Sequence, residues 1–92
     1  MMTHIKAVWT ASLVNEIDNI TQLRMIRKAL SKLEGPVDFV IFDPDAAEER
    51  IEDGGITARV PWNGLPEKCY AQIDDHGGDT GKVLTIYKAS ER

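Results

Sequence analysis

Apolar and polar residues alternate along much of the chain, and this alternation predicts most of its strands. A period of two, typical of a strand with one buried face, runs through residues 4–14, 56–62 and 68–74. Residues 37–42 and 82–89 are short runs rich in β-branched and aromatic side chains, which also favour strands. Residues 11–14 are the exception, because Ala-Ser-Leu-Val is equally suited to begin a helix.

A long helix is predicted at residues 20–34, where apolar residues recur with the period of an α-helix. They fill one sector, the predicted buried face, which contains Leu23, Ile26, Ala29, Leu30 and Leu33. Basic side chains form a stripe on the opposite side, made of Arg24, Lys28 and Lys32 with Arg27 beside them. We expect the helix to end at Gly35, which suits a left-handed cap, before Pro36.

A second, short helix is predicted from Asp43 to about Glu52. Asp43 is a favourable N-cap, Pro44 suits the first helical position, and Gly54-Gly55 would end the helix. Few of its residues are apolar, so this helix would bury little surface, and part of it would be loop.

Together the elements predict an α+β fold in the order β-α-β-short α-β-β-β, as a single domain over residues 1–92. The first strand, long helix and second strand would form a right-handed βαβ unit, followed by a meander that ends in a hairpin. The sheet would be a small, mostly antiparallel single layer with one long amphipathic helix packed on one face. Its other face would be polar, or covered by the acidic segment or a second chain, so a homodimer is one alternative.

Composition is that of an ordinary folded protein and points to the cytoplasm. The 92 residues are 42% hydrophobic and 28% charged, enough for one domain. No window of about 18 apolar residues predicts a membrane span, and the N-terminus lacks the features of a secretory signal. The single cysteine, Cys69, cannot form an internal disulfide, which fits a reducing compartment.

Acidic residues are concentrated in the middle of the chain. The net charge is −4, and residues 37–75 alone carry ten acids against three bases. The densest part, called the acidic segment below, spans residues 43–53 and contains Asp43, Asp45, Glu48, Glu49, Glu52 and Asp53. Such a segment suits a basic protein partner, whereas nucleic acid is an unfavourable partner for a negative chain. Trp62, in the proline-flanked loop 61–66, suits either an aromatic anchor for that partner or a core position.

The sequence contains no recognisable catalytic or cofactor-binding motif. The glycines of residues 77–82 lack the spacing of a phosphate-binding loop, and the acids and histidine of residues 74–79 lack that of a calcium or zinc site. Cys69 alternates in phase with Ala71, which predicts a buried thiol rather than a nucleophile paired with His4 or His76. We therefore expect no cofactor, no metal and no catalytic residue.

The leading hypothesis is a non-enzymatic intracellular binding module whose acidic segment and Trp62 engage a basic, nucleic-acid-binding surface of a partner protein. Small acidic inhibitors and adaptors, including phage-encoded inhibitors, share this size and charge, and the inhibitor type rests on that analogy. The alternative is a dimeric nucleic-acid-binding regulator that contacts phosphates through Arg24, Arg27, Lys28 and Lys32. A less favoured third is a small enzyme or ligand-binding domain with its pocket near residues 75–81.

Overall fold

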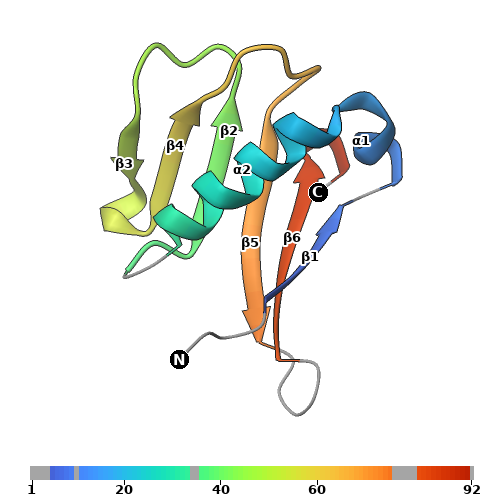
Figure 1. The fold of residues 1–92 in the computed structure, drawn as a ribbon. Coiled ribbons are helices and arrows are strands. Elements are labelled where there is room, and N and C mark those ends of the chain that lie inside the picture. The colour runs from blue at the N-terminus through green and yellow to red at the C-terminus, as the bar shows by residue number, and fades with distance from the viewer. Residues whose placement is uncertain (1–4, 10, 34–35, 76–80, 92) are drawn as a thin grey trace.

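The computed structural model describes residues 5–9, 11–33, 36–75 and 81–91. Within these residues the chain forms a six-stranded mixed sheet with two helices on one of its faces (Figure 1), which confirms the predicted α+β class. The elements are β1 (Ile5–Trp9), α1 (Ala11–Glu16), α2 (Asn19–Lys32), β2 (Phe39–Asp43), β3 (Arg50–Glu52), the 3₁₀ turn η1 (Asp53–Gly55), β4 (Thr57–Pro61), β5 (Cys69–Asp75), β6 (Lys82–Lys88) and the 3₁₀ turn η2 (Ala89–Glu91).

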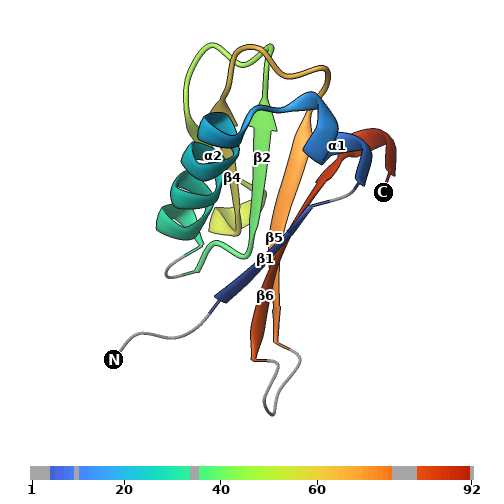
Figure 2. The same cartoon turned by 45° about the vertical axis from the view of Figure 1, so that its right-hand side comes forward.

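The strand order is β1-β6-β5-β2-β4-β3, with β1–β6 and β2–β4 parallel and the other neighbours antiparallel. The predicted hairpin of the last two strands is confirmed, since β5 and β6 pair from Cys69↔Lys88 to Asp75↔Lys82. This hairpin lies between β1 and β2, so the two strands of the predicted βαβ unit run parallel in one sheet but are not neighbours (Figure 1; Figure 2). Alternation fixes which side of each strand is buried, but it carries no information about which strands are neighbours.

Helix α2 confirms the long helix but not its predicted orientation. Asp18 caps it, because the Thr21 N–H donates to Asp18 Oδ2 at 3.2 Å. Met25 and Ala29 are fully buried, whereas Leu23 is 64% exposed, so the prediction that Leu23 is buried is wrong. Ile26, Leu30 and Leu33 are partly buried against the core. The helix is therefore rotated so that Met25 faces the sheet and the side that carries Lys28 and Lys32 moves closer to it.

The first predicted strand ends early. It stops at Trp9, and Ala11–Glu16 form α1, so the strand interpretation of residues 11–14 is wrong and the helical alternative is right. Leu13 and Ile17 are both buried, because residues four positions apart lie on the same side of a helical turn. Lys88 of β6 joins α1 to the sheet through an ion pair with Glu16 at 2.8 Å.

The short helix predicted from Asp43 to Glu52 is wrong. Asp43 instead closes a turn, in which its Oδ1 accepts the Asp45 N–H at 2.8 Å and its carbonyl oxygen accepts the Trp62 N–H at 3.1 Å. Arg50–Glu52 then form the edge strand β3, paired with β4. A segment with so few apolar residues gains more from the backbone hydrogen bonds of a sheet edge than from an isolated helix.

The core lies between the helices and the sheet. Its largest fully buried side chains are Phe42, Leu13, Met25, Leu84 and Ile86. Among the described residues, none of the helices has the length and apolar character needed to cross a bilayer.

Candidate functional site

The structure distributes the predicted acidic segment over several contacts. Asp43 and Glu52 both bind Arg59, Asp53 accepts a hydrogen bond from Thr57 at 3.0 Å, and Glu49 pairs with Lys28 and Lys32 of α2. Asp45 and Glu48 are exposed, and in the described part of the chain they form no ion pair. Four of the six acids therefore have partners within the fold, which leaves fewer free charges than the sequence suggests.

Arg59 forms the most enclosed ion-pair cluster. Its Nη1 lies 2.6 Å from Asp43 Oδ2, and its Nε lies 2.9 Å from Glu52 Oε2. Burial opposes ionisation of Asp43, but hydrogen bonds from the Asp45 N–H and Arg59 hold its pKa below the ordinary value. Hydrogen bonding to Arg59 also lowers the pKa of Glu52, and the two carboxylates raise the pKa of Arg59. The guanidinium charge is thus neutralised within the sheet.

The side of the sheet opposite the helices carries a row of aromatic rings. Tyr70 packs against Phe39 with centroids 5.0 Å apart and against the edge of Tyr87 at 5.7 Å. The Tyr87 hydroxyl donates to Gln72 Oε1 at 2.9 Å. Ile41 lies in register with Tyr70 on the same side. We call this surface, comprising Phe39, Ile41, Tyr70, Gln72 and Tyr87, the aromatic face.

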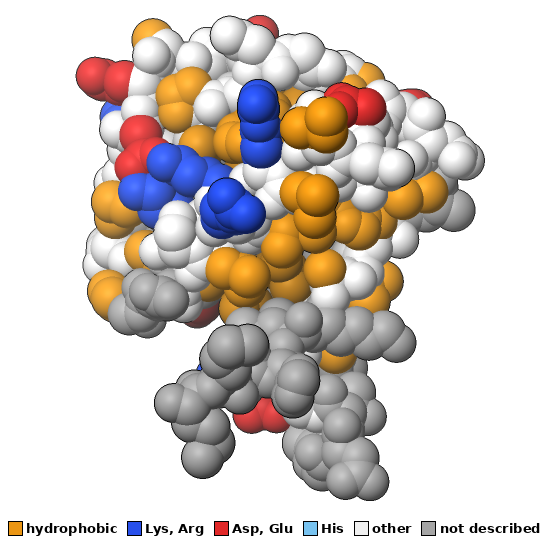
Figure 3. Space-filling model, viewed as in Figure 1, with side chains coloured by type: hydrophobic (Ala, Val, Ile, Leu, Met, Phe, Trp, Pro, Cys, Tyr) orange, Lys and Arg blue, Asp and Glu red, His pale blue; other side chains and the backbone are white. Residues whose placement is uncertain are grey.

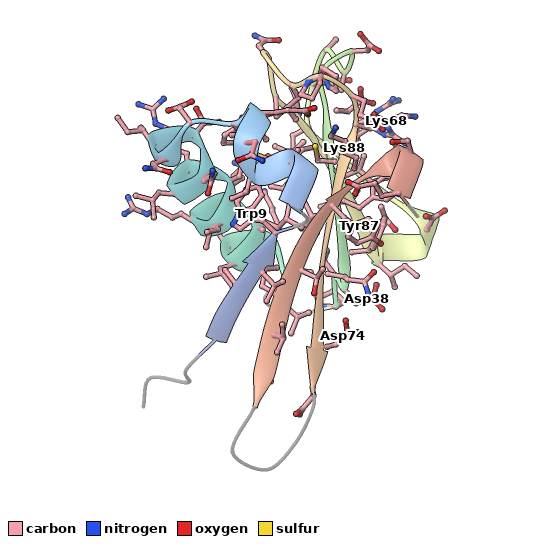
Figure 4. All side chains as sticks on the ribbon, turned by 90° about the vertical axis from the view of Figure 1, so that its right-hand side faces the viewer. Trp9, Asp38, Lys68, Asp74, Tyr87 and Lys88 are labelled. Carbon is pink, nitrogen blue, oxygen red and sulfur yellow. The ribbon has the colours of Figure 1, made fainter. Side chains whose placement is uncertain are left out.

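Two adjoining hollows in the aromatic face are bordered by carboxylates. One, of about 350 Å³, is lined by Phe39, Tyr70, Asp38 and Asp53 among others. The other, of about 250 Å³, shares Asp38 and Phe39 and adds Asp74. Figure 4 shows Asp38, Asp74 and Tyr87 on the side of the sheet away from α1 and α2. No Lys or Arg is among the described residues that line either hollow, so the charged side chains around both hollows are carboxylates.

A larger cleft of about 530 Å³ lies on the helix side, between α2 and the end of β4. We call it the basic cleft; it is lined by Arg24, Arg27, Lys28, Ser31, Glu49, Val60, Pro61 and Trp62. Figure 3 views this side and shows Lys and Arg side chains gathered beside an acidic one, with a band of apolar side chains next to them. Trp62 belongs to the protein-binding hypothesis, and the basic stripe belongs to the nucleic-acid-binding alternative. The structure places Trp62 in the same cleft as Arg24, Arg27 and Lys28 of that stripe.

Trp62 is held in place from within the fold. Its ring meets the buried Phe42 edge-on at a centroid distance of 5.3 Å, and the backbone N–H of Trp62 donates to the Asp43 carbonyl. The ring is only partly buried and lines the cleft. The ring therefore packs on the core through Phe42 and also lines the cleft.

Cys69 is buried, as its alternation predicted. Burial raises the pKa of the thiol to about 11, so the reactive thiolate is scarce at neutral pH. In the described residues no three His, Cys, Asp or Glu side chains are grouped as metal ligands. His4, His76, Gly77 and Gly78 lie outside the described residues, whereas Gly81 of the same predicted loop is described.

We expect a disulfide reagent such as 5,5′-dithiobis(2-nitrobenzoate) to modify native Cys69 about 100-fold or more slowly than the urea-unfolded chain at pH 7. A pKa raised from 9.0 to about 11 lowers the thiolate fraction by about that factor, and burial lowers access further. Absorbance of the released thiolate measures both rates. Equal rates would show that Cys69 is open to solvent.

Comparison with protein-family models, curated proteins and solved structures found no match for this chain.

The sequence reasoning missed the aromatic face and the acids beside it. Asp38 and Asp74 lie outside the acidic segment, and Phe39, Tyr70 and Tyr87 come from three different strands. A signal was present, since the period that buries Cys69 and Ala71 must turn Tyr70 and Gln72 to the opposite side. What the period does not show is that the strands carrying these residues are neighbours.

Proposed function

We propose that this protein is a non-enzymatic binding module whose aromatic face binds a basic segment of another protein. The observation that carries the proposal is the pair of hollows in which Asp38, Asp53 and Asp74 border aromatic rings with no described cation among them. Arg59, a partly buried cation on the neighbouring strand β4, is already neutralised by Asp43 and Glu52. An arginine or lysine from a partner would supply the missing positive charge.

The chemistry of the hollows suits such side chains. An arginine can stack on an aromatic ring while its guanidinium hydrogen-bonds a carboxylate, and both contacts gain from partial desolvation. The charge of residues 37–75 would also speed the approach of a positive partner. The rings pack on one another, so little side-chain entropy is lost on binding.

This proposal keeps the basic partner expected from the sequence and changes the surface that meets it. Asp53 and Glu52 of the acidic segment lie at or beside the aromatic face, whereas Glu49 lies on the other side of the sheet. A cytoplasmic inhibitor or adaptor that covers a nucleic-acid-binding surface of its partner would use the protein in this way. A free cysteine fits that compartment.

A nine-residue polyarginine peptide, followed by two-dimensional NMR at low and high salt, tests the proposal. We expect the largest shifts at Phe39, Tyr70 and Asp74, and about a three- to tenfold weaker binding when Asp38→Asn is combined with Asp74→Asn. The matched control combines Asp45→Asn with Glu48→Gln, which removes the same charge from exposed positions of the acidic segment.

The outcomes separate the hypotheses. If the control pair weakens binding more than the Asp38/Asp74 pair, the acidic segment itself is the binding surface and the aromatic face is not. If light scattering shows a dimer that dissociates on Tyr70→Ala, a second copy of the chain covers the aromatic face and the proposal is wrong.

A further inference from the structure

We infer that the basic cleft is a second binding site, which takes a short acidic peptide segment with an apolar side chain between its carboxylates. The inference does not depend on the aromatic face, since the cleft lies on the opposite side of the sheet. It combines a positive wall from α2 with an apolar floor from β4 and Trp62.

The positive wall has unused charge. Lys28 and Lys32 are engaged by Glu49, with Lys28 Nζ at 3.1 Å from Glu49 Oε1. Arg24 and Arg27 also belong to the wall, and neither forms an ion pair within the described part of the chain. Arginine binds a carboxylate through two parallel hydrogen bonds, so this pair suits acidic side chains of a ligand.

Glu49 is an internal example of the proposed ligand. It is a carboxylate on the loop that precedes β3, it reaches the same helix, and hydrogen bonding to Lys32 lowers its pKa. Arg24 and Arg27 lie nearer the N-terminal end of α2 than the two lysines that Glu49 binds. A partner peptide with a carboxylate at that end of the cleft would pair with Arg24 and Arg27 as Glu49 pairs with the lysines. The charge complementarity that the fold already uses for its own chain therefore indicates the chemistry of the partner.

The floor and the length of the cleft determine two further properties of the ligand, its apolar side chain and its length. Val60, Pro61 and Trp62 form an apolar surface beside the cations, and the Trp62 ring is fixed by Phe42 and needs no ordering on binding. From Arg24 to Ser31 the helix rises about 10 Å, which equals about three residues of extended chain. A motif of an apolar residue flanked by acids fits that length.

The test uses Trp62 as its own reporter. In the variant Trp9→Phe, Trp62 is the remaining tryptophan, and its emission is followed during titration with an acetylated pentapeptide of a central leucine and flanking aspartates. We expect a saturable change with this peptide and none with its asparagine analogue. Hexathymidylate is the third probe, because a basic wall with a tryptophan also suits single-stranded nucleic acid.

Two matched pairs of variants localise the binding. Arg27→Gln should lower the affinity for the acidic peptide about three- to tenfold. Arg50→Gln removes the same charge from an exposed site on β3 and should change that affinity less than about twofold. Glu49→Gln should strengthen binding about two- to fivefold by freeing Lys28 and Lys32. Its control, Glu48→Gln, changes the net charge equally at an adjacent exposed position.

Each result decides the inference. It is supported when the acidic peptide alone changes Trp62 emission and both variant pairs differ from their controls. It is overturned when Trp62 does not respond, when the neutral analogue binds equally, or when hexathymidylate binds and the peptide does not. Two-dimensional NMR of the unmodified chain repeats the titration without the Trp9 substitution.

Discussion

Met25→Ala is expected to lower the free energy of unfolding by about 2–5 kcal/mol, while Leu23→Ala lowers it by less than about 0.5 kcal/mol. Met25 is fully buried and packs in the core, so its truncation removes buried apolar atoms and leaves a cavity. Leu23 is 64% exposed and loses few contacts. Urea unfolding followed by circular dichroism at 222 nm measures both values.

This comparison tests the orientation of α2 directly. The apolar sector read from the sequence has Leu23 on its buried face, and that orientation gives the opposite ranking. Leu30, which is partly buried, should fall between the two. If Leu23→Ala is the more damaging change, the helix is rotated as the sequence pattern alone predicts, and the basic cleft described above does not exist.

Local structure was the part of the fold that the sequence predicts well. The runs at residues 37–42, 56–62, 68–74 and 82–89 each overlap one strand, to within two residues at either end, and the last two form the expected hairpin. These predictions succeed because the alternation of side chains is a local property of an extended chain. The order of the strands depends instead on long-range packing. The sequence therefore does not predict that β6 and β5 lie between β1 and β2.

The orientation of α2 failed for a related reason. Its apolar stripe is wider than the surface that the sheet buries, so periodicity leaves a choice between Leu23 and Met25 at its two margins. Attraction of Lys28 and Lys32 to Glu49, a residue of a distant loop, accompanies the orientation that buries Met25. The sequence of the helix alone does not predict its contact with the 44–49 loop.

The candidate sites show the same limit. Trp62 and Arg24 are far apart in sequence and meet only because α2 lies beside the end of β4. The dense acids of residues 43–53 suggested one continuous surface, but the turn at Asp43 and the pairing of β3 with β4 direct Glu52 to Arg59 and leave Glu49 facing α2. Composition identified the chemistry available, and the topology determined which groups share a surface.

Arg59→Gln is expected to lower the free energy of unfolding by about 1–2 kcal/mol at pH 7. The change leaves the Asp43 carboxylate, whose side chain is only 11% exposed, without its ionic partner. The partial exposure of Arg59 and Glu52 keeps the effect below that of a fully buried pair. Arg50→Gln is the control, because Arg50 is 63% exposed and lies 3.9 Å from Glu52, and it should cost less than about 0.5 kcal/mol.

The pH dependence of the Arg59→Gln effect separates charge from packing. Asp43 and Glu52 have pKa values below their ordinary values of 3.8 and 4.5 in the folded chain. The stability they contribute is therefore fully present above those values and is lost as the pH falls through the lowered ones, because the unfolded chain takes up protons first. The difference between wild type and Arg59→Gln in urea unfolding should thus shrink steadily from pH 5 towards about pH 2. A difference that stays constant would mean that Arg59 stabilises the sheet through its aliphatic stem and that its ion pairs with Asp43 and Glu52 contribute nothing.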